Sequence, residues 1–119
     1  MRIKLIKIFE GAIYQSEVWD YWLLIQLKNE QIIKIFDDKC FASSLAEGEF
    51  YNFELSPSIF INKFDIDLMP VIGDIIFHNG VKYFRNNHLE LRLKDCDEIM
   101  EIKDSFFGVG RIDLLSVEP

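Results

Sequence analysis

The sequence predicts an all-β protein, a small antiparallel barrel or sandwich of eight to nine short strands. Half of the 119 residues are hydrophobic and 11 of them are phenylalanine, a residue that favours strands over helices. Apolar and polar residues also alternate in short runs between turn residues, as is typical of antiparallel sheets. A chain of this length fits one domain, which we expect to span residues 1–119.

The first strand is expected at residues 2–14, with an interruption at Gly11, because a glycine inside a strand often marks a bulge or a bend. Residues 18–28 and 31–37 are rich in apolar and β-branched side chains, and they predict a hairpin.

The turn of this hairpin is predicted at Asn29 and Glu30. A two-residue turn at this point would place Leu27 opposite Ile32, and it would place Leu23 opposite Phe36.

Ser44 and Glu47 have the Ser-x-x-Glu spacing of a helix-capping box, and Gly48 suits the end of a helix. We therefore expect a single helical turn at Ser44–Glu47. Residues 49–55 alternate strictly and predict the next strand.

The second half of the chain predicts a three-stranded meander over residues 74–94. Asn79-Gly80 between two apolar runs is a strong signal for a hairpin. Alternation at residues 88–94 predicts a strand that buries three leucines on one face: Leu89, Leu91 and Leu93. Residues 95–103 fit either a short helix or a strand, and residues 109–117 predict the final strand.

The first half resembles an OB-fold barrel. The resemblance rests on the long first strand with its break at Gly11, the hairpin that follows, the single turn at Ser44–Glu47, and the Leu45–Leu55 run in which Gly48 precedes an alternating strand. It implies a small β-barrel. OB domains bind oligonucleotides or oligosaccharides and also dock proteins, so the resemblance alone does not choose a function.

The net charge is −7, from 20 acidic and 13 basic residues. This charge repels phosphate backbones and anionic membranes at long range, which argues against nucleic acid and membranes as partners and favours a basic protein. No stretch approaches the ~20 apolar residues that span a bilayer. Cys40 and Cys96 are too few for a disulfide scaffold, so we expect reduced thiols and a cytoplasmic location.

Acidic side chains concentrate near the C-terminal end of the meander, where five occur within ten residues. Complementary charge accelerates association, so we expect this acidic cluster to dock a basic partner, although a solvated face that aids solubility is the alternative. The five residues are Asp95, Asp97, Glu98, Glu101 and Asp104.

Tyr14, Trp19 and Tyr21 are the candidates for stacking a base or a sugar, because aromatic rings supply such platforms. Packing in the core or at the rim of the barrel is the alternative for these aromatic residues.

No catalytic motif occurs, and we expect no catalytic residue, metal or cofactor. His78 and His88 would lie at opposite ends of one strand, too far apart to share a zinc ion.

The leading hypothesis is a non-catalytic module that acts through protein–protein contact, either an immunity-type neutraliser of a basic toxin or an accessory subunit. The alternative is an OB-type binder of single-stranded nucleic acid or oligosaccharide. An enzyme is the third and least favoured hypothesis, and formation of a homo-oligomer stays open.

Overall fold

The computed structural model describes residues 2–63, 65–93 and 106–119. The described residues form thirteen short strands and one 3₁₀ turn, which confirms the all-β prediction. The strands outnumber the eight to nine expected because several long runs divide into shorter pieces that join different sheets.

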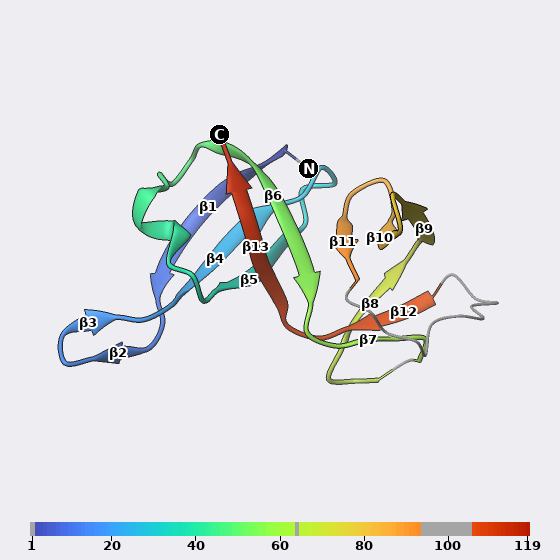
Figure 1. Ribbon diagram of the computed structural model, residues 1–119, viewed down its shortest axis with the longest axis horizontal. Coiled ribbons are helices and arrows are strands. Elements are labelled where there is room, and N and C mark those ends of the chain that lie inside the picture. Colours follow the sequence, from blue (N-terminus) through green and yellow to red (C-terminus); the bar gives the residue numbers. More distant parts are fainter. Residues whose placement is uncertain (1, 64, 94–105) are drawn as a thin grey trace.

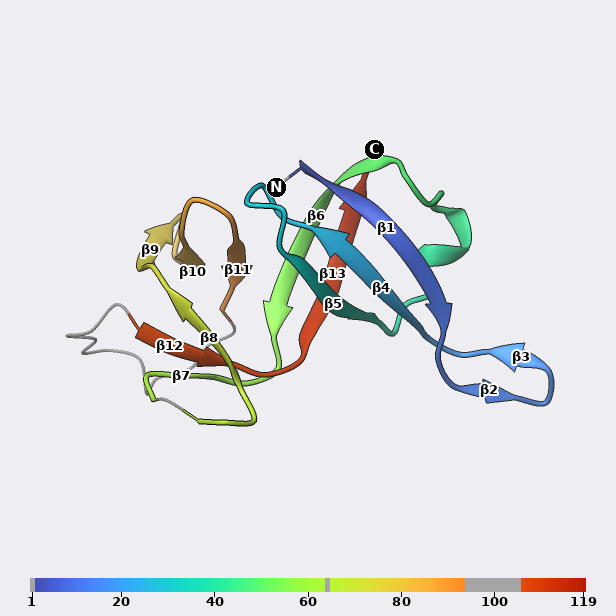
Figure 2. The ribbon, with the colours of Figure 1, turned by 180° about the vertical axis from the view of Figure 1, so that it is seen from behind.

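Five strands close a barrel at one side of the molecule (Figures 1 and 2). Their spatial order is β1-β4-β5-β13-β6, and β6 pairs with β1 to complete the ring. All neighbours are antiparallel except β5 and β13, which run parallel. The strands are β1 (Arg2–Glu10), β4 (Tyr21–Gln26), β5 (Ile32–Asp37), β6 (Phe50–Pro57) and β13 (Ile112–Glu118).

Alternation along the strands builds the interior of the barrel. Leu23 and Ile25 on β4 and Ile33 and Ile35 on β5 point inward and are buried. Two register shifts, after Leu5 in β1 and after Leu114 in β13, add the local twist that helps a sheet of few strands to close.

The predicted register of the β4–β5 hairpin is wrong by one residue. Leu27 N–H donates to the carbonyl of Gln31, and Glu30 adopts a positive φ of 68°. The turn therefore contains three residues, with a left-handed residue last. As a result Leu23 lies opposite Ile35, not opposite Phe36.

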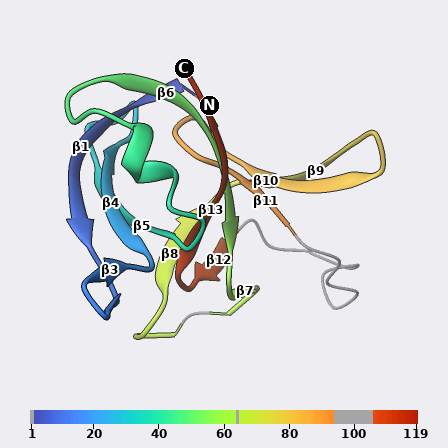
Figure 3. The ribbon, with the colours of Figure 1, turned by 60° about the vertical axis from the view of Figure 1, so that its left-hand side comes forward.

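The short helical turn lies earlier than predicted. The structure has a 3₁₀ turn, η1, at Phe41–Ser44, and it covers one end of the barrel (Figure 3). The buried carboxylate of Asp37 accepts hydrogen bonds from the N–H groups of Lys39, Phe41 and Ala42. These hydrogen bonds determine that η1 begins at Phe41. Glu47 instead accepts a hydrogen bond from the N–H of Ile8 in β1.

The expected first strand divides near Gly11, as predicted. Beyond it, the short strands β2 (Ile13–Tyr14) and β3 (Glu17–Val18) form a hairpin that projects from the barrel (Figure 1). The expected final strand also divides. Phe106–Val109 forms β12 in another sheet, and β13 begins at Ile112 after a break at Gly110.

Residues 58–111 are inserted between the last two strands of the barrel in chain order, β6 and β13, and their described part is called the inserted lobe below (Figure 1). One of its sheets has the order β7-β12-β8, with β7 at Phe60–Ile61 and β8 at Met69–Ile72. The other is the predicted meander, with the order β11-β10-β9. Its strands are β9 (Asp74–His78), β10 (Val81–Arg85) and β11 (Glu90–Arg92).

The predicted details of the meander are confirmed. Asn79 and Gly80 both have positive φ, 51° and 79°, as the tight hairpin turn requires. Leu89, Leu91 and Leu93 are all buried.

Three phenylalanines form the centre of the inserted lobe. The rings of Phe60 and Phe107 stack with their centroids 4.7 Å apart, and the ring of Phe84 packs edge-on against Phe107 at 5.7 Å. The buried side chains of barrel and lobe form one continuous hydrophobic cluster. An ion pair of 2.9 Å between Arg92 in β11 and Glu54 in β6 also joins the two parts.

Candidate aromatic and cationic binding face

Three aromatic side chains lie in one row on the outside of the barrel. The register pairs Phe9 of β1 with Trp22 of β4, and Trp22 with Phe36 of β5. Directly paired residues of neighbouring strands share a face, and the next residues along β4 and β5, Leu23 and Ile35, point into the core. The row therefore faces outward. The rings of Trp22 and Phe36 are in contact, with their centroids 4.8 Å apart.

A basic side chain lies over each ring of the row. The ammonium nitrogen of Lys7 lies 5.2 Å from the ring centroid of Phe9, and that of Lys34 lies 4.3 Å from Trp22. The guanidinium carbon of Arg111 lies 4.6 Å from the ring centroid of Phe36. These distances fall within the range of cation–π attraction. The six side chains are called the aromatic–cation face below.

A groove of about 520 Å³ borders this face on the side of the inserted lobe. Trp22, Lys34 and Arg111 line it on the barrel side. Asp67 and Met69 line it on the side of the lobe. Together the row and the groove form a platform with a wall along one edge.

Arg111 is held in place by Asp113. Its Nε and Nη2 atoms donate to the two carboxylate oxygens at 2.6 and 3.3 Å. This hydrogen bonding raises the pKa of Arg111 above its ordinary value, so its positive charge is secure. Asp113 also offsets much of that charge, so Lys7 and Lys34 are the cations of the face that form no ion pair with a carboxylate among the described residues.

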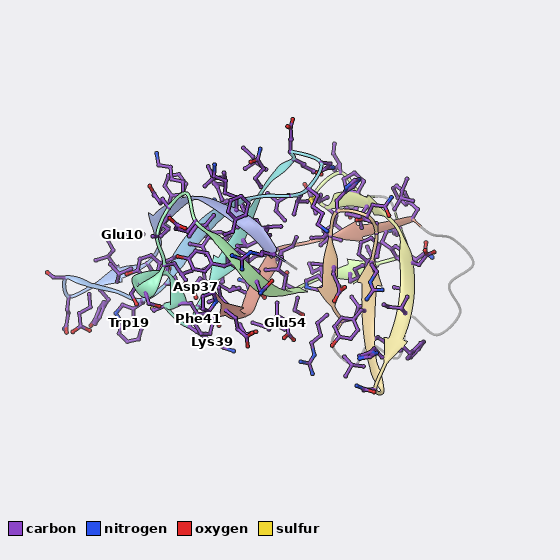
Figure 4. The ribbon with its side chains drawn as sticks, turned by 90° about the horizontal axis from the view of Figure 1, so that it is seen from above. Glu10, Trp19, Asp37, Lys39, Phe41 and Glu54 are labelled. Atoms are coloured by element: carbon purple, nitrogen blue, oxygen red, sulfur yellow. The ribbon has the colours of Figure 1, made fainter. Side chains whose placement is uncertain are left out.

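A larger cleft of about 670 Å³ lies between the barrel and the meander. Lys39, Lys82 and Arg92 line it together with Glu54, but no aromatic ring does. Figure 4 shows Lys39 and Glu54 on the same side of the barrel. A cleft without rings offers no stacking platform, so it is the weaker candidate despite its volume.

The predicted stacking residues lie in two different places. Tyr14 and Trp19 belong to the projecting hairpin, where their rings meet edge-on at 6.2 Å and are 63% and 58% exposed. Figure 4 shows Trp19 beside the hairpin, far from Glu54 and the lobe. Tyr21 packs against the core, next to Trp22 but on the opposite face of β4.

The predicted acidic cluster, Asp95, Asp97, Glu98, Glu101 and Asp104, lies outside the described residues, as does the ambiguous segment 95–103. Its role as a docking surface stays a prediction.

In residues 2–63, 65–93 and 106–119 no group of three or more His, Cys, Asp or Glu side chains could hold a metal ion. Among the same residues Cys40 is a free thiol, and it donates a hydrogen bond to the carbonyl of Trp19 at 3.2 Å. None of the described residues belongs to a helix long and apolar enough to cross a membrane.

Sequence reasoning overlooked all six side chains of the aromatic–cation face, because the predicted stacking residues did not include Trp22, Phe9 or Phe36 and no cation was expected beside them. The cations lie far apart in the chain, at positions 7, 34 and 111, and they form no basic run. The length of the β4–β5 turn could have revealed the row, because a three-residue turn places Trp22 opposite Phe36.

No protein family model, curated protein or solved structure matches this chain.

Proposed function

We propose that the chain is a non-catalytic binding module that takes a short stretch of single-stranded nucleic acid across the aromatic–cation face. The observation that carries the proposal is the row of three outward rings, each with a basic side chain above it. Stacking bases on rings while cations contact phosphates is the general mode of single-strand binding.

The position of the face supports this ligand. The strand order β1-β4-β5-β13-β6 is compatible with an OB-like barrel, in which β4 and β5 would be the second and third strands. OB-folds bind extended ligands on that face, between the loop after the first strand and the loop before the last. Here those loops are the β2–β3 hairpin and the inserted lobe.

The net charge of −7 opposes a nucleic acid at long range, but the local charges decide contact. At physiological ionic strength, exposed charges more than ~8 Å apart are largely screened. The described acids near the face include Asp113, which Arg111 engages, Asp38, whose charge also acts on Arg111, and Asp67 on the far wall of the groove. Lys7 and Lys34 are thus available to phosphate groups, whereas a neutral oligosaccharide would gain hydrogen bonds from them but no ionic attraction.

The two tryptophans allow a direct test, because one lies in the row and the other on the hairpin. The variant Trp19→Phe leaves Trp22 as the single fluorescent tryptophan, and Trp22→Phe leaves Trp19 as the matched control. Titration with oligothymidylate at low salt is expected to quench Trp22 and to leave Trp19 unchanged.

Absence of quenching in both variants would remove the proposal. If a neutral glucose oligomer quenched Trp22 and the oligonucleotide did not, the aromatic–cation face would still be the binding site, but its ligand would be an oligosaccharide.

A protein partner is the second candidate, and the β2–β3 hairpin favours it. Ile13, Tyr14 and Trp19 are exposed there, and the sequence from Ile8 to Leu27 contains acidic residues but no lysine or arginine. Exposed aromatic residues beside acids suit a basic protein surface. Two variants would show which surface docks the partner, one with the hairpin acids neutralised and one with the acidic cluster at 95–104 neutralised. The variant that no longer captures the partner identifies the docking surface.

A further inference from the structure

Within residues 2–63, 65–93 and 106–119, β9 is an edge strand of the meander. Among the described residues it pairs with β10 alone, without a register shift from Asp74 to His78. Exposed edges attract other strands, so proteins usually protect them. The barrel has no edge because it is closed, β8 contains Pro70, and the opposite edge of the meander, β11, is three residues long and packs on β6.

β9 carries none of these protections. Its sequence, Asp-Ile-Ile-Phe-His, has no lysine, no proline and no bulge. Phe77 is 68% exposed, and Ile72 just before the strand is 65% exposed. Figure 3 shows the β9–β10 hairpin projecting away from the barrel.

The register tells which backbone groups are available. His78 and Val81 flank the two-residue turn, and such a flanking pair is hydrogen-bonded. Hydrogen-bonded pairs alternate along an antiparallel ladder, so Asp74 and Ile76 also bond to β10. Ile75 and Phe77 then direct their N–H and C=O groups toward the open edge.

We propose that β9 pairs antiparallel with β9 of a second copy of this chain, in a two-fold dimer centred on Ile76. In this register Ile75 lies opposite Phe77 of the second copy. These are the two residues whose backbone groups face the edge, so both can exchange hydrogen bonds across the interface. The six-stranded sheet that results would join the two meanders.

The ends of the strand are complementary in the same register. Asp74 lies opposite His78 of the second copy, and both residues are exposed in the single chain. The carboxylate can accept a hydrogen bond from the imidazole ring at each end of the interface. Phe77 also gains a neighbour, Ile75 of the second copy, on the same face, and such aromatic–aliphatic cross-strand pairs stabilise sheets. A two-fold axis repeats each contact, as an isologous interface requires.

Analytical ultracentrifugation of the full chain over a wide range of concentration tests the proposal. We expect a reversible monomer–dimer equilibrium. Phe77→Pro removes an N–H that faces the open edge and leaves the β9–β10 ladder intact, so it should weaken dimerisation about tenfold or more. Phe77→Thr keeps that N–H and serves as the control for the lost ring, and circular dichroism confirms that each variant is folded.

An exchange of the end residues gives a rescue that a merely structural role would not show. His78→Asp places two carboxylates opposite each other and should weaken the dimer. The double variant Asp74→His with His78→Asp restores the complementary pair and should restore the dimer. A chain that stays monomeric at every concentration, or a dimer that neither Phe77→Pro nor His78→Asp weakens, would overturn the proposal.

Discussion

Asp37 makes a contact that can be tested separately from function. It ends β5, is fully buried, and accepts three backbone hydrogen bonds. One oxygen accepts from Lys39 and Phe41 at 3.3 and 3.2 Å, and the other accepts from Ala42 at 2.8 Å. We predict that Asp37→Asn destabilises the protein, because the amide can replace one of these oxygens but not both.

The magnitude follows from the oxygen that the amide cannot replace. Whichever way the amide turns, its N–H₂ group faces a backbone N–H, that of Ala42 or those of Lys39 and Phe41, and neither group can accept a hydrogen bond. An unsatisfied buried donor costs ~1–3 kcal/mol, and a hydrogen bond to a charged group contributes ~1.5–3 kcal/mol. The free energy of unfolding should therefore fall by about 2–4 kcal/mol. Urea slopes of ~1–3 kcal/mol/M convert this loss to a decrease of about 2 M in the unfolding midpoint.

The adjacent Asp38 supplies the matched control. It is exposed, and Asp38→Asn makes the same change in charge without removing a hydrogen bond between its side chain and the described backbone. Urea unfolding, followed by circular dichroism, should show a large shift for Asp37→Asn and a small one for Asp38→Asn. Equal midpoints for the two variants would refute the account of how η1 is held.

Three further predictions concern the inserted lobe and can be checked by the same unfolding measurement. Phe107→Ala should cost ~3–5 kcal/mol because it empties the centre of the phenylalanine cluster. Phe77→Ala, measured at a concentration low enough to keep the chain monomeric, should be nearly neutral because Phe77 is exposed in the single chain; similar costs would contradict the assigned core. Gly73→Ala should destabilise by ~1–3 kcal/mol, because its Cβ would lie 2.5 Å from the carbonyl oxygen of Arg85; a neutral result would disagree with this close approach. Glu54→Gln should cost less than ~1 kcal/mol, since its ion pair with Arg92 is exposed, and a larger loss would mean that this pair holds lobe and barrel together.

The fold class and the meander could be predicted from the sequence because their signals are local. Asn79-Gly80 specifies its own turn, and the alternation of Leu89, Leu91 and Leu93 specifies which face is buried. The barrel could not be fully predicted, since its closure depends on β13, which pairs with β5 and β6 from far along the chain. Propensity gives no information about which distant strands will pair.

The aromatic–cation face was missed for a related reason. A one-residue difference in turn length moves the opposite residue from one face of a strand to the other. The expected two-residue turn placed Leu23 opposite Phe36 and hid the pairing of Phe36 with Trp22. The position of η1 was missed because a buried carboxylate at Asp37, outside the apparent capping box at Ser44, determines where the turn starts.

The most direct test of the central claim is nuclear magnetic resonance of the isotopically labelled chain during titration with oligothymidylate. Binding at the aromatic–cation face predicts that the largest changes in chemical shift occur at Phe9, Trp22 and Phe36. It also predicts a salt dependence of the binding constant with a logarithmic slope of about −1.4, as phosphate contacts from the two cations Lys7 and Lys34 would give for a single strand. Changes confined to the β2–β3 hairpin or the meander, or no changes at low salt, would contradict the claim.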